Sequence, residues 1–144
     1  MPTRPIHEVL AGRPFLAVGA DVSVREVTRL MQAQDRSSAL VTEHGVLTGI
    51  FTERDATFRV LAAGLDPDAA AVGQVMTHTP YTLSDDQPFG YALHLMYESC
   101  VRHVPVVDGN NRPLGVLTAR DALGVEAEAF GSDLERRQAI TAIL

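Results

Sequence analysis

The chain has 144 residues, a formal net charge of −6 and a pI of about 5.2. This acidic balance argues against a nucleic-acid partner, which requires a basic face, and the longest apolar stretches are too short to span a bilayer. The single cysteine, Cys100, excludes an internal disulfide framework, and we expect a cytoplasmic protein without a secretory leader.

The first half of the chain predicts a strand, a helix, two strands and a second helix. A strand is expected near Phe15–Val18, and Ser23–Glu26 has the pattern of a capping box that opens a helix. Two short strands are expected at Ser38–Thr42 and Val46–Phe51 around a turn, followed by a helix over Glu53–Ala63.

The second half repeats this plan after a short linker, Leu65–Ala71, which follows a helix-ending glycine at Gly64. The elements expected there are a strand near Tyr81–Leu83, a helix with Pro88 in its first turn, strands at Val104–Val107 and Leu114–Leu117, and a helix after Thr118. We expect a break at Gly131–Asp133 and then a short amphipathic helix, Leu134–Leu144, whose apolar side requires a partner.

An eight-residue phrase occurs twice in the chain. Gly49–Ala56 (GIFTERDA) returns as Gly115–Ala122 (GVLTARDA), 66 residues later. A repeat of this size predicts two copies of one structural unit. Each copy has about 60 residues, near the lower limit for an independent core, so we expect the copies to pack face to face.

The doubled phrase has the same polar residues at the same positions in both copies: Thr52, Arg54 and Asp55, and Thr118, Arg120 and Asp121. Threonine with an acid three residues later is, first, the signal of a helix N-cap. A cap does not require the arginine, however, and a strand that leads into a helix also offers free N–H groups to a phosphate. We therefore interpret the threonine as a phosphate contact and the aspartate as an acceptor for a ribose diol, in addition to capping.

Together with the lead-in Val75–Pro80 and the segment Arg102–Asp108, the doubled phrase resembles a tandem pair of CBS domains, the regulatory unit called a Bateman module. The resemblance covers about residues 6–126 and implies an α+β fold of two βαββα repeats around a pseudo-two-fold axis. It places the first CBS domain at 6–66, the second at 72–130, and a C-terminal helical tail at 131–144. The first copy matches less closely, because Ser37–Thr42 replaces the Arg-His-Val-Pro-Val-Val pattern.

The resemblance also implies a set of ligand-binding residues. The threonines of the phrase contact phosphate, the aspartates hold the ribose, adenine lies against the lead-in segments, and basic residues before the Pro-Val-Val strand reach phosphates. Beyond the two phrases, the residues concerned are Arg13, Pro14 and Phe15, Thr79, Pro80 and Tyr81, and Arg102 and His103. The first-copy counterparts of the last two are Ser37 and Ser38, which are uncharged, so we expect unequal affinities at the two clefts.

We thus expect a regulatory, energy-sensing module that binds an adenine nucleotide or adenosyl compound, with AMP, ADP and ATP first, and that signals by a conformational shift. We expect no catalytic residue, catalytic cofactor or metal, and either a homodimer or control of a separate protein. Two alternatives stay open: a structural dimerisation module with degenerate sites, and a nucleotide-processing enzyme. Against the enzyme, no set of a nucleophile and a base is visible.

Overall fold

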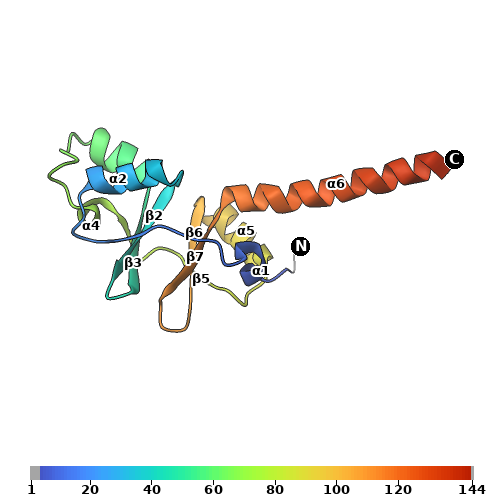
Figure 1. Cartoon of the computed structure of the whole chain (residues 1–144), viewed down its shortest axis with the longest axis horizontal. Coiled ribbons are helices and arrows are strands. Elements are labelled where there is room, and N and C mark those ends of the chain that lie inside the picture. The colour runs from blue at the N-terminus through green and yellow to red at the C-terminus, as the bar shows by residue number, and fades with distance from the viewer. Residues whose placement is uncertain (1–3, 144) are drawn as a thin grey trace.

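The protein consists of two α+β units, side by side, from which one long helix projects (Figure 1). The computed structural model describes residues 4–143, with side chains described over 4–124 and 131–141. Among the described residues no helix is long and apolar enough to cross a bilayer.

The first unit is built on a four-stranded sheet with the order β1-β2-β3-β4. Its strands are β1 (Ala17–Gly19), β2 (Ser38–Glu43), β3 (Val46–Thr52) and β4 (Thr77–His78). Strand β1 runs parallel to β2, whereas β2 with β3 and β3 with β4 are antiparallel. Its helices are α2 (Val24–Ala33), α3 (Glu53–Asp55), the π-helix η1 (Ala56–Leu61) and α4 (Val72–Val75).

The second unit is built on a three-stranded sheet with the order β5-β6-β7. Its strands are β5 (Leu83–Ser84), β6 (His103–Val107) and β7 (Pro113–Thr118), and its helices are α1 (Ile6–Leu10), α5 (Phe89–Ser99) and α6 (Ala119–Ile143). As in the first unit, a short strand lies parallel to the first strand of an antiparallel hairpin. The predicted α+β fold with two similar repeats is confirmed.

Local sequence signals explain most of the element boundaries. The hydroxyl of Ser23 accepts a hydrogen bond from the backbone N–H of Glu26 at 3.2 Å and so opens α2, as predicted. Pro88 occupies the N-cap of α5, and Gly64 has a φ of +73° just after η1.

The predicted break at Gly131–Asp133 is wrong. Helix α6 runs without interruption from Ala119 to Ile143, so the separate helix expected from Leu134 onward belongs to one 25-residue helix; Leu144, its expected last residue, lies outside the described residues. A single glycine costs a helix interior only about 1 kcal/mol, which hydrogen bonding in the neighbouring turns can offset.

The two units exchange their lead-in segments, which precede β1 in the first copy (residues 6–15) and β5 in the second (Val75–Pro80). Strand β4 stands in the second copy of the repeat, yet it pairs with β3 of the first sheet, with Gly49 opposite His78 and Ile50 opposite Thr77. Conversely, α1 stands in the first copy, but its Ile6 and Leu10 are buried in the second core beside Phe89. Each unit is therefore completed by residues from the other copy.

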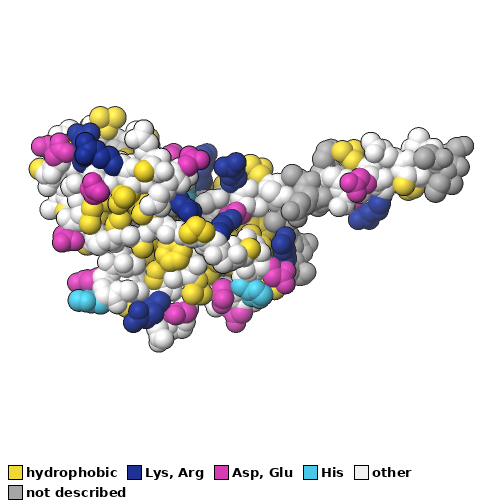
Figure 2. All heavy atoms as spheres, in the orientation of Figure 1, with side chains coloured by type: hydrophobic (Ala, Val, Ile, Leu, Met, Phe, Trp, Pro, Cys, Tyr) yellow, Lys and Arg dark blue, Asp and Glu magenta, His cyan; other side chains and the backbone are white. Residues whose placement is uncertain are grey.

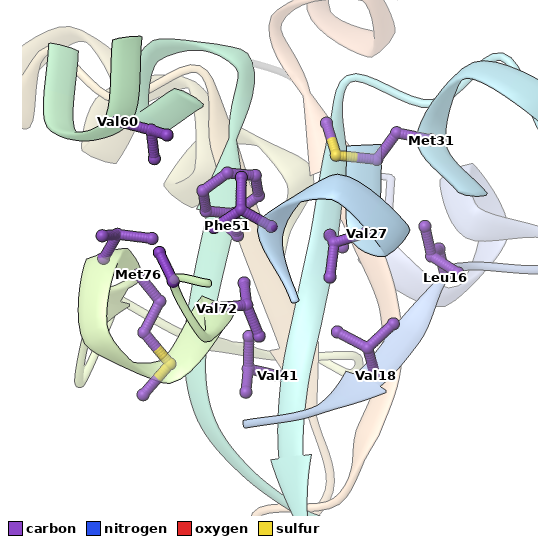
Figure 3. Packing of buried hydrophobic residues seen from close by; sticks show 13 residues of the cluster. Leu16, Val18, Val27, Met31, Val41, Phe51, Val60, Val72 and Met76 are labelled. Atoms are coloured by element: carbon purple, nitrogen blue, oxygen red, sulfur yellow. The ribbon is translucent and has the colours of Figure 1, made fainter. Parts of the chain in front are cut away.

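Among the residues whose side chains are described, three apolar clusters form the core. The first, drawn in Figure 3, packs α2, η1 and α4 against one face of the first sheet through residues such as Val27, Phe51 and Val72. The second lies under α1 and α5. The third joins the two sheets, because Leu40, Leu47 and Ile50 pack against side chains that include Val107 and Val116. The units therefore share a core, as their small size requires.

Candidate functional site

Both copies of the doubled phrase open onto one cavity of about 1380 Å³ between the two units. Its volume exceeds the range usual for a pocket that holds one small ligand. All fourteen residues predicted for the ligand site line it: Arg13, Pro14, Phe15, Thr52, Arg54, Asp55, Thr79, Pro80, Tyr81, Arg102, His103, Thr118, Arg120 and Asp121. The structure thus brings together side chains that lie up to 108 residues apart.

The first junction is a complete capping box. The backbone N–H of Asp55 donates to the Thr52 hydroxyl at 3.4 Å, and the N–H of Thr52 donates to Oδ2 of Asp55 at 3.0 Å. The capping interpretation of Thr52 is therefore confirmed. The carboxylate of Asp55 is only 8% exposed, and it also meets the Thr77 hydroxyl at 3.3 Å and Nε of Arg59 at 3.4 Å.

The second junction is closed in a different way. The N–H of Thr118 donates to Oδ2 of Asp121 at 2.7 Å, and both oxygens of this carboxylate accept from the guanidinium of Arg13 at 2.6 Å. Arg13 also donates to the carbonyl of Val116 at 2.9 Å. Burial alone would raise the pKa of Asp121, but the hydrogen bonds from Arg13 and Thr118 and the charge of Arg13 outweigh it and lower the pKa.

Each junction is completed by the lead-in segment of the other repeat. Thr77 of the second lead-in binds Asp55 of the first copy, and Arg13 of the first lead-in binds Asp121 of the second. The close approach depends on the glycine that opens the phrase: a Cβ on Gly49 would lie 2.8 Å from the backbone oxygen of Thr77. The equivalent Gly115 lies against Leu10 of the other lead-in.

His103 lines the cavity and links the two units. Its Nε2 shares a hydrogen bond of 2.7 Å with the hydroxyl of Ser37, from the first copy. Burial is the main cause that lowers the pKa of His103, assisted by the charge of Arg102, while Glu53 and Asp55 oppose the shift. In the described part of the chain, no group of three or more histidine, cysteine or carboxylate side chains gathers as a metal site.

The cavity carries a positive balance although the chain is acidic. Seven of the twelve arginines line it, against four carboxylates: Arg4, Arg13, Arg36, Arg54, Arg59, Arg102 and Arg120, with Asp35, Glu53, Asp55 and Asp121. In Figure 2 basic and acidic side chains lie together near the middle of the molecule. Such a cavity favours an anion, which guanidinium groups bind well.

Three of the lining residues that were not predicted bear on the site: Arg36, Arg59 and Thr77. Arg59 and Thr77 bind Asp55, and the Nε of Arg36 is the buried side-chain nitrogen or oxygen that lacks a hydrogen-bond partner among the described residues. The sequence offers a signal for Thr77, which stands directly after Met76 in the lead-in. It offers one for Arg59 as well, which stands one helical turn after Asp55 in the predicted helix Glu53–Ala63. It offers none for Arg36, which only the fold brings to the cavity.

The fold is that of a two-repeat α+β module with exchanged lead-in segments. The family model for the CBS domain matches the chain twice, over residues 6–61 and 72–128. The chain therefore belongs to the CBS domain family and carries two copies in tandem, as its resemblance predicted.

Curated relatives resemble the chain over part of their own length. The meiotically up-regulated gene 70 protein of Schizosaccharomyces pombe is 39% identical over 105 residues, which cover 73% of this chain and 14% of that protein. An uncharacterised protein of Methanopyrus kandleri is 28% identical over 120 residues, which cover 83% of this chain and 59% of that protein. The chain thus spans less than two thirds of these relatives.

Solved structures resemble it over nearly their whole length. The CBS-domain containing protein from Agrobacterium tumefaciens is 28% identical with a TM-score of 0.77, over 85% of this chain and 99% of that one. A CBS domain protein from Pyrobaculum aerophilum, solved in complex with AMP, is 28% identical with a TM-score of 0.75, over 82% and 89% of the two chains.

Proposed function

We propose that the chain is a regulatory module that binds an adenine nucleotide, with AMP, ADP or ATP as first candidates, in the cavity between its two CBS repeats, and that it has no catalytic role. One observation carries this proposal: two copies of a strand-to-helix junction open onto a cavity in which arginines outnumber carboxylates, in a chain of net charge −6. The AMP complex of the Pyrobaculum aerophilum protein supports the choice of ligand.

The residues have distinct roles in this proposal. The hydroxyls of Thr52 and Thr118 contact phosphate, and the carboxylate of Asp121 accepts from the ribose hydroxyls. The lead-in segments Arg13–Phe15 and Thr79–Tyr81 lie against adenine, and Arg102 supplies positive charge to the phosphates. Three of these side chains keep a structural role as well: the two threonines bond to their aspartates, and Asp121 accepts the N–H of Thr118.

Each junction forms its own binding cleft within the cavity, one at Asp55 and one at Asp121. The two clefts differ in affinity for the nucleotide, and the cleft at Asp121 is occupied first. Asp55 is the more buried carboxylate and is enclosed by Thr77 and Arg59. Both of these side chains must move before a ribose reaches it, and burying a polar ligand group without full hydrogen bonding is costly. At Asp121 only the half-exposed Arg13 stands in the way.

Signalling follows from the way the cavity is built. Because both units line it, a nucleotide that contacts both stabilises one relative arrangement of the two units. A ligand shifts such an equilibrium only by its difference in affinity for the two arrangements. A second copy of the chain or a separate regulated protein then reads the shift, and in the cytoplasm this couples the partner to nucleotide levels.

Helix α6 offers a surface for a second copy of the chain. It extends far beyond the body of the molecule (Figure 1). Leu134 and Ile140 are exposed on its outer half. Light scattering coupled to size exclusion should show a homodimer for the full chain and a monomer for a chain that ends at residue 130. The same number of chains per particle in both proteins would contradict this part of the proposal.

A thermal-shift panel tests the ligand. AMP, ADP, ATP, NAD and S-adenosylmethionine are added in turn, and a ligand at about 100 times its dissociation constant should stabilise the fold by about 2.7 kcal/mol. Chromatography of the mixtures checks for turnover, whose detection would favour the enzyme alternative. A flat response to all five would favour the structural dimerisation module. Asp55 and Asp121 already have ion-pair partners within the chain, so neither carboxylate requires a ligand in that alternative.

A further inference from the structure

The ion pair between Arg13 and Asp121 has a geometry that a ribose diol can replace. The guanidinium presents two N–H donors to the two carboxylate oxygens, each at 2.6 Å. The 2′- and 3′-hydroxyls of a ribose also present two neighbouring donors, and a carboxylate is an acceptor-only group with a limited number of lone pairs. The N–H and the hydroxyl of Thr118 already donate to Oδ2 of Asp121. The carboxylate therefore cannot accept from the guanidinium of Arg13 and from a ribose diol at the same time.

We propose that Arg13 occupies the position of the ribose in the ligand-free chain, and that it thereby makes the cleft at Asp121 selective for adenosine compounds that carry phosphate. This inference rests on the proposed function and assigns Arg13 a role in specificity.

The segment around Arg13 allows the exchange. Its backbone is held, because the N–H of Arg13 donates to the carbonyl of Leu10 at 3.0 Å within a turn that contains Ala11 and Gly12 at positive φ. Its side chain is 38% exposed and long, so the guanidinium can leave Asp121 without any movement of the fold. Displacement by a ribose is therefore a side-chain event.

Selectivity arises from what the displaced guanidinium meets. When it leaves Asp121, Arg13 loses two charge-assisted hydrogen bonds and stays in a cavity that six other arginines also line. A phosphate on the incoming ligand gives the guanidinium a new anionic partner. A neutral nucleoside offers no such partner. The loss of the ion pair is therefore not compensated when a nucleoside binds, and the affinity for the nucleoside falls relative to that for the nucleotide.

The other junction provides an internal contrast. The ion pair of Arg59 with Asp55 is longer, with Nε 3.4 Å from the carboxylate, and Arg59 also donates from Nη1 to the carbonyl of Met76. Thr52 and Thr77, the other partners of that carboxylate, are neutral. The exchange of a two-pronged ion pair for a diol is thus a property of the Asp121 cleft.

The test compares adenosine with AMP by isothermal titration calorimetry for the parent, Arg13→Gln and Arg13→Lys. In Arg13→Gln we expect adenosine to bind about tenfold more tightly than in the parent while the affinity for AMP changes little, so that the preference for AMP falls about tenfold. Arg13→Lys keeps the charge but not the two-pronged pair, so it should strengthen adenosine binding and retain most of the affinity for AMP.

Arg25→Gln is the matched control. Arg25 forms a similar two-pronged pair with Asp68, at 3.0 and 3.4 Å, on the exposed surface away from the cavity, so this variant should bind both ligands as the parent does. Circular dichroism verifies the fold of each variant. If Arg13→Gln does not fold, the adenosine gain in Arg13→Lys decides alone.

The outcomes separate the two proposals. A parent that binds AMP, with a preference over adenosine that Arg13→Gln leaves unchanged, overturns the role of Arg13 and leaves the nucleotide-binding function standing. Adenosine binding that appears only in the Arg13 variants supports both. Parent and variants that bind neither ligand reject the nucleotide-binding function and this role with it.

Discussion

In the proposed function, nucleotide binding at the second cleft depends on Asp121. Asp121→Ala removes the proposed ribose acceptor, so we expect the affinity for AMP to fall at least about tenfold, the usual loss for one charged hydrogen-bonding group. The fold should persist, with a loss of about 1–2 kcal/mol because the N–H of Thr118 loses its acceptor. Calorimetry and urea unfolding measure the two effects.

The control for this change is Asp68→Ala, which removes a carboxylate that pairs with Arg25 on the surface. It should leave the affinity for AMP unaltered. An Asp121→Ala protein that binds AMP as tightly as the parent would show that the ribose has been placed at the wrong residue.

His103 should make the stability of the fold depend on pH. Because its pKa in the folded chain lies below the ordinary value of 6.5, the unfolded chain binds the proton more readily. The free energy of unfolding therefore falls as the pH decreases below about 6.5, and it levels off below the folded-state pKa. Urea unfolding between about pH 5 and pH 8 measures this slope.

The variant His103→Gln isolates the contribution of this side chain from that of the other four histidines. Glutamine keeps a hydrogen-bonding partner for Ser37 but does not titrate. We expect a smaller loss of stability in acid for the variant, and equal slopes for both proteins would refute the assignment.

At the level of single residues, the doubled phrase marks six side chains at equivalent positions, and the resemblance to CBS domains adds the other eight of the fourteen that line one cavity. The sequence did not reveal their pairing. The partners Arg13 of Asp121 and Thr77 of Asp55 come from the opposite repeat, and no local pattern encodes which lead-in meets which junction.

Among the elements, the hairpins and the helix starts could be predicted, because alternation and capping act within a few neighbouring residues. Strand β4 could not, since its two residues form a strand only by pairing with β3. Helix α6 differs in the opposite sense: Gly131–Asp133 predicts a break, but the helix continues through it because the residues on both sides favour a helix.

The glycine that opens each phrase allows the lead-in of the other unit to approach, and its replacement tests this contact. In Gly49→Ala the new Cβ meets the backbone oxygen of Thr77 at 2.8 Å, so β4 must move and we expect a loss of about 2–3 kcal/mol. In Gly115→Ala it meets the end of the Leu10 side chain at 2.9 Å, which can rotate, so we expect about 1 kcal/mol.

Gly109→Ala serves as the reference, because no atom lies within 4 Å of a Cβ at that position. Its stability in urea should match that of the parent within about 0.5 kcal/mol. Equal losses of stability in Gly49→Ala and Gly115→Ala would contradict the expected difference between a contact with backbone and a contact with a movable side chain.

For the molecule as a whole, the exchanged segments predict that the two repeats fold together. A fragment of residues 1–66 lacks Val72, Val75 and Met76, all of which are buried in the first core. We expect this fragment alone to show no cooperative transition in urea, and a mixture with residues 67–144 to regain one. The full chain should unfold in a single step.

Two separate transitions of the full chain, seen by circular dichroism and by tyrosine fluorescence, would contradict this expectation. They would mean that each repeat is stable without the segment that the other supplies. The third apolar cluster, which spans both sheets, is the physical reason to expect one transition.

The exchange of lead-ins also bears on how such a chain could arise. A chain with a single copy of the repeat could form this arrangement as a dimer of identical chains, in which the first residues of each chain pack against the other. Joining the two copies through Leu65–Ala71 makes this intermolecular contact intramolecular. Assembly then no longer depends on protein concentration, and the two halves become free to diverge, as Arg13 and its counterpart Thr79 already have.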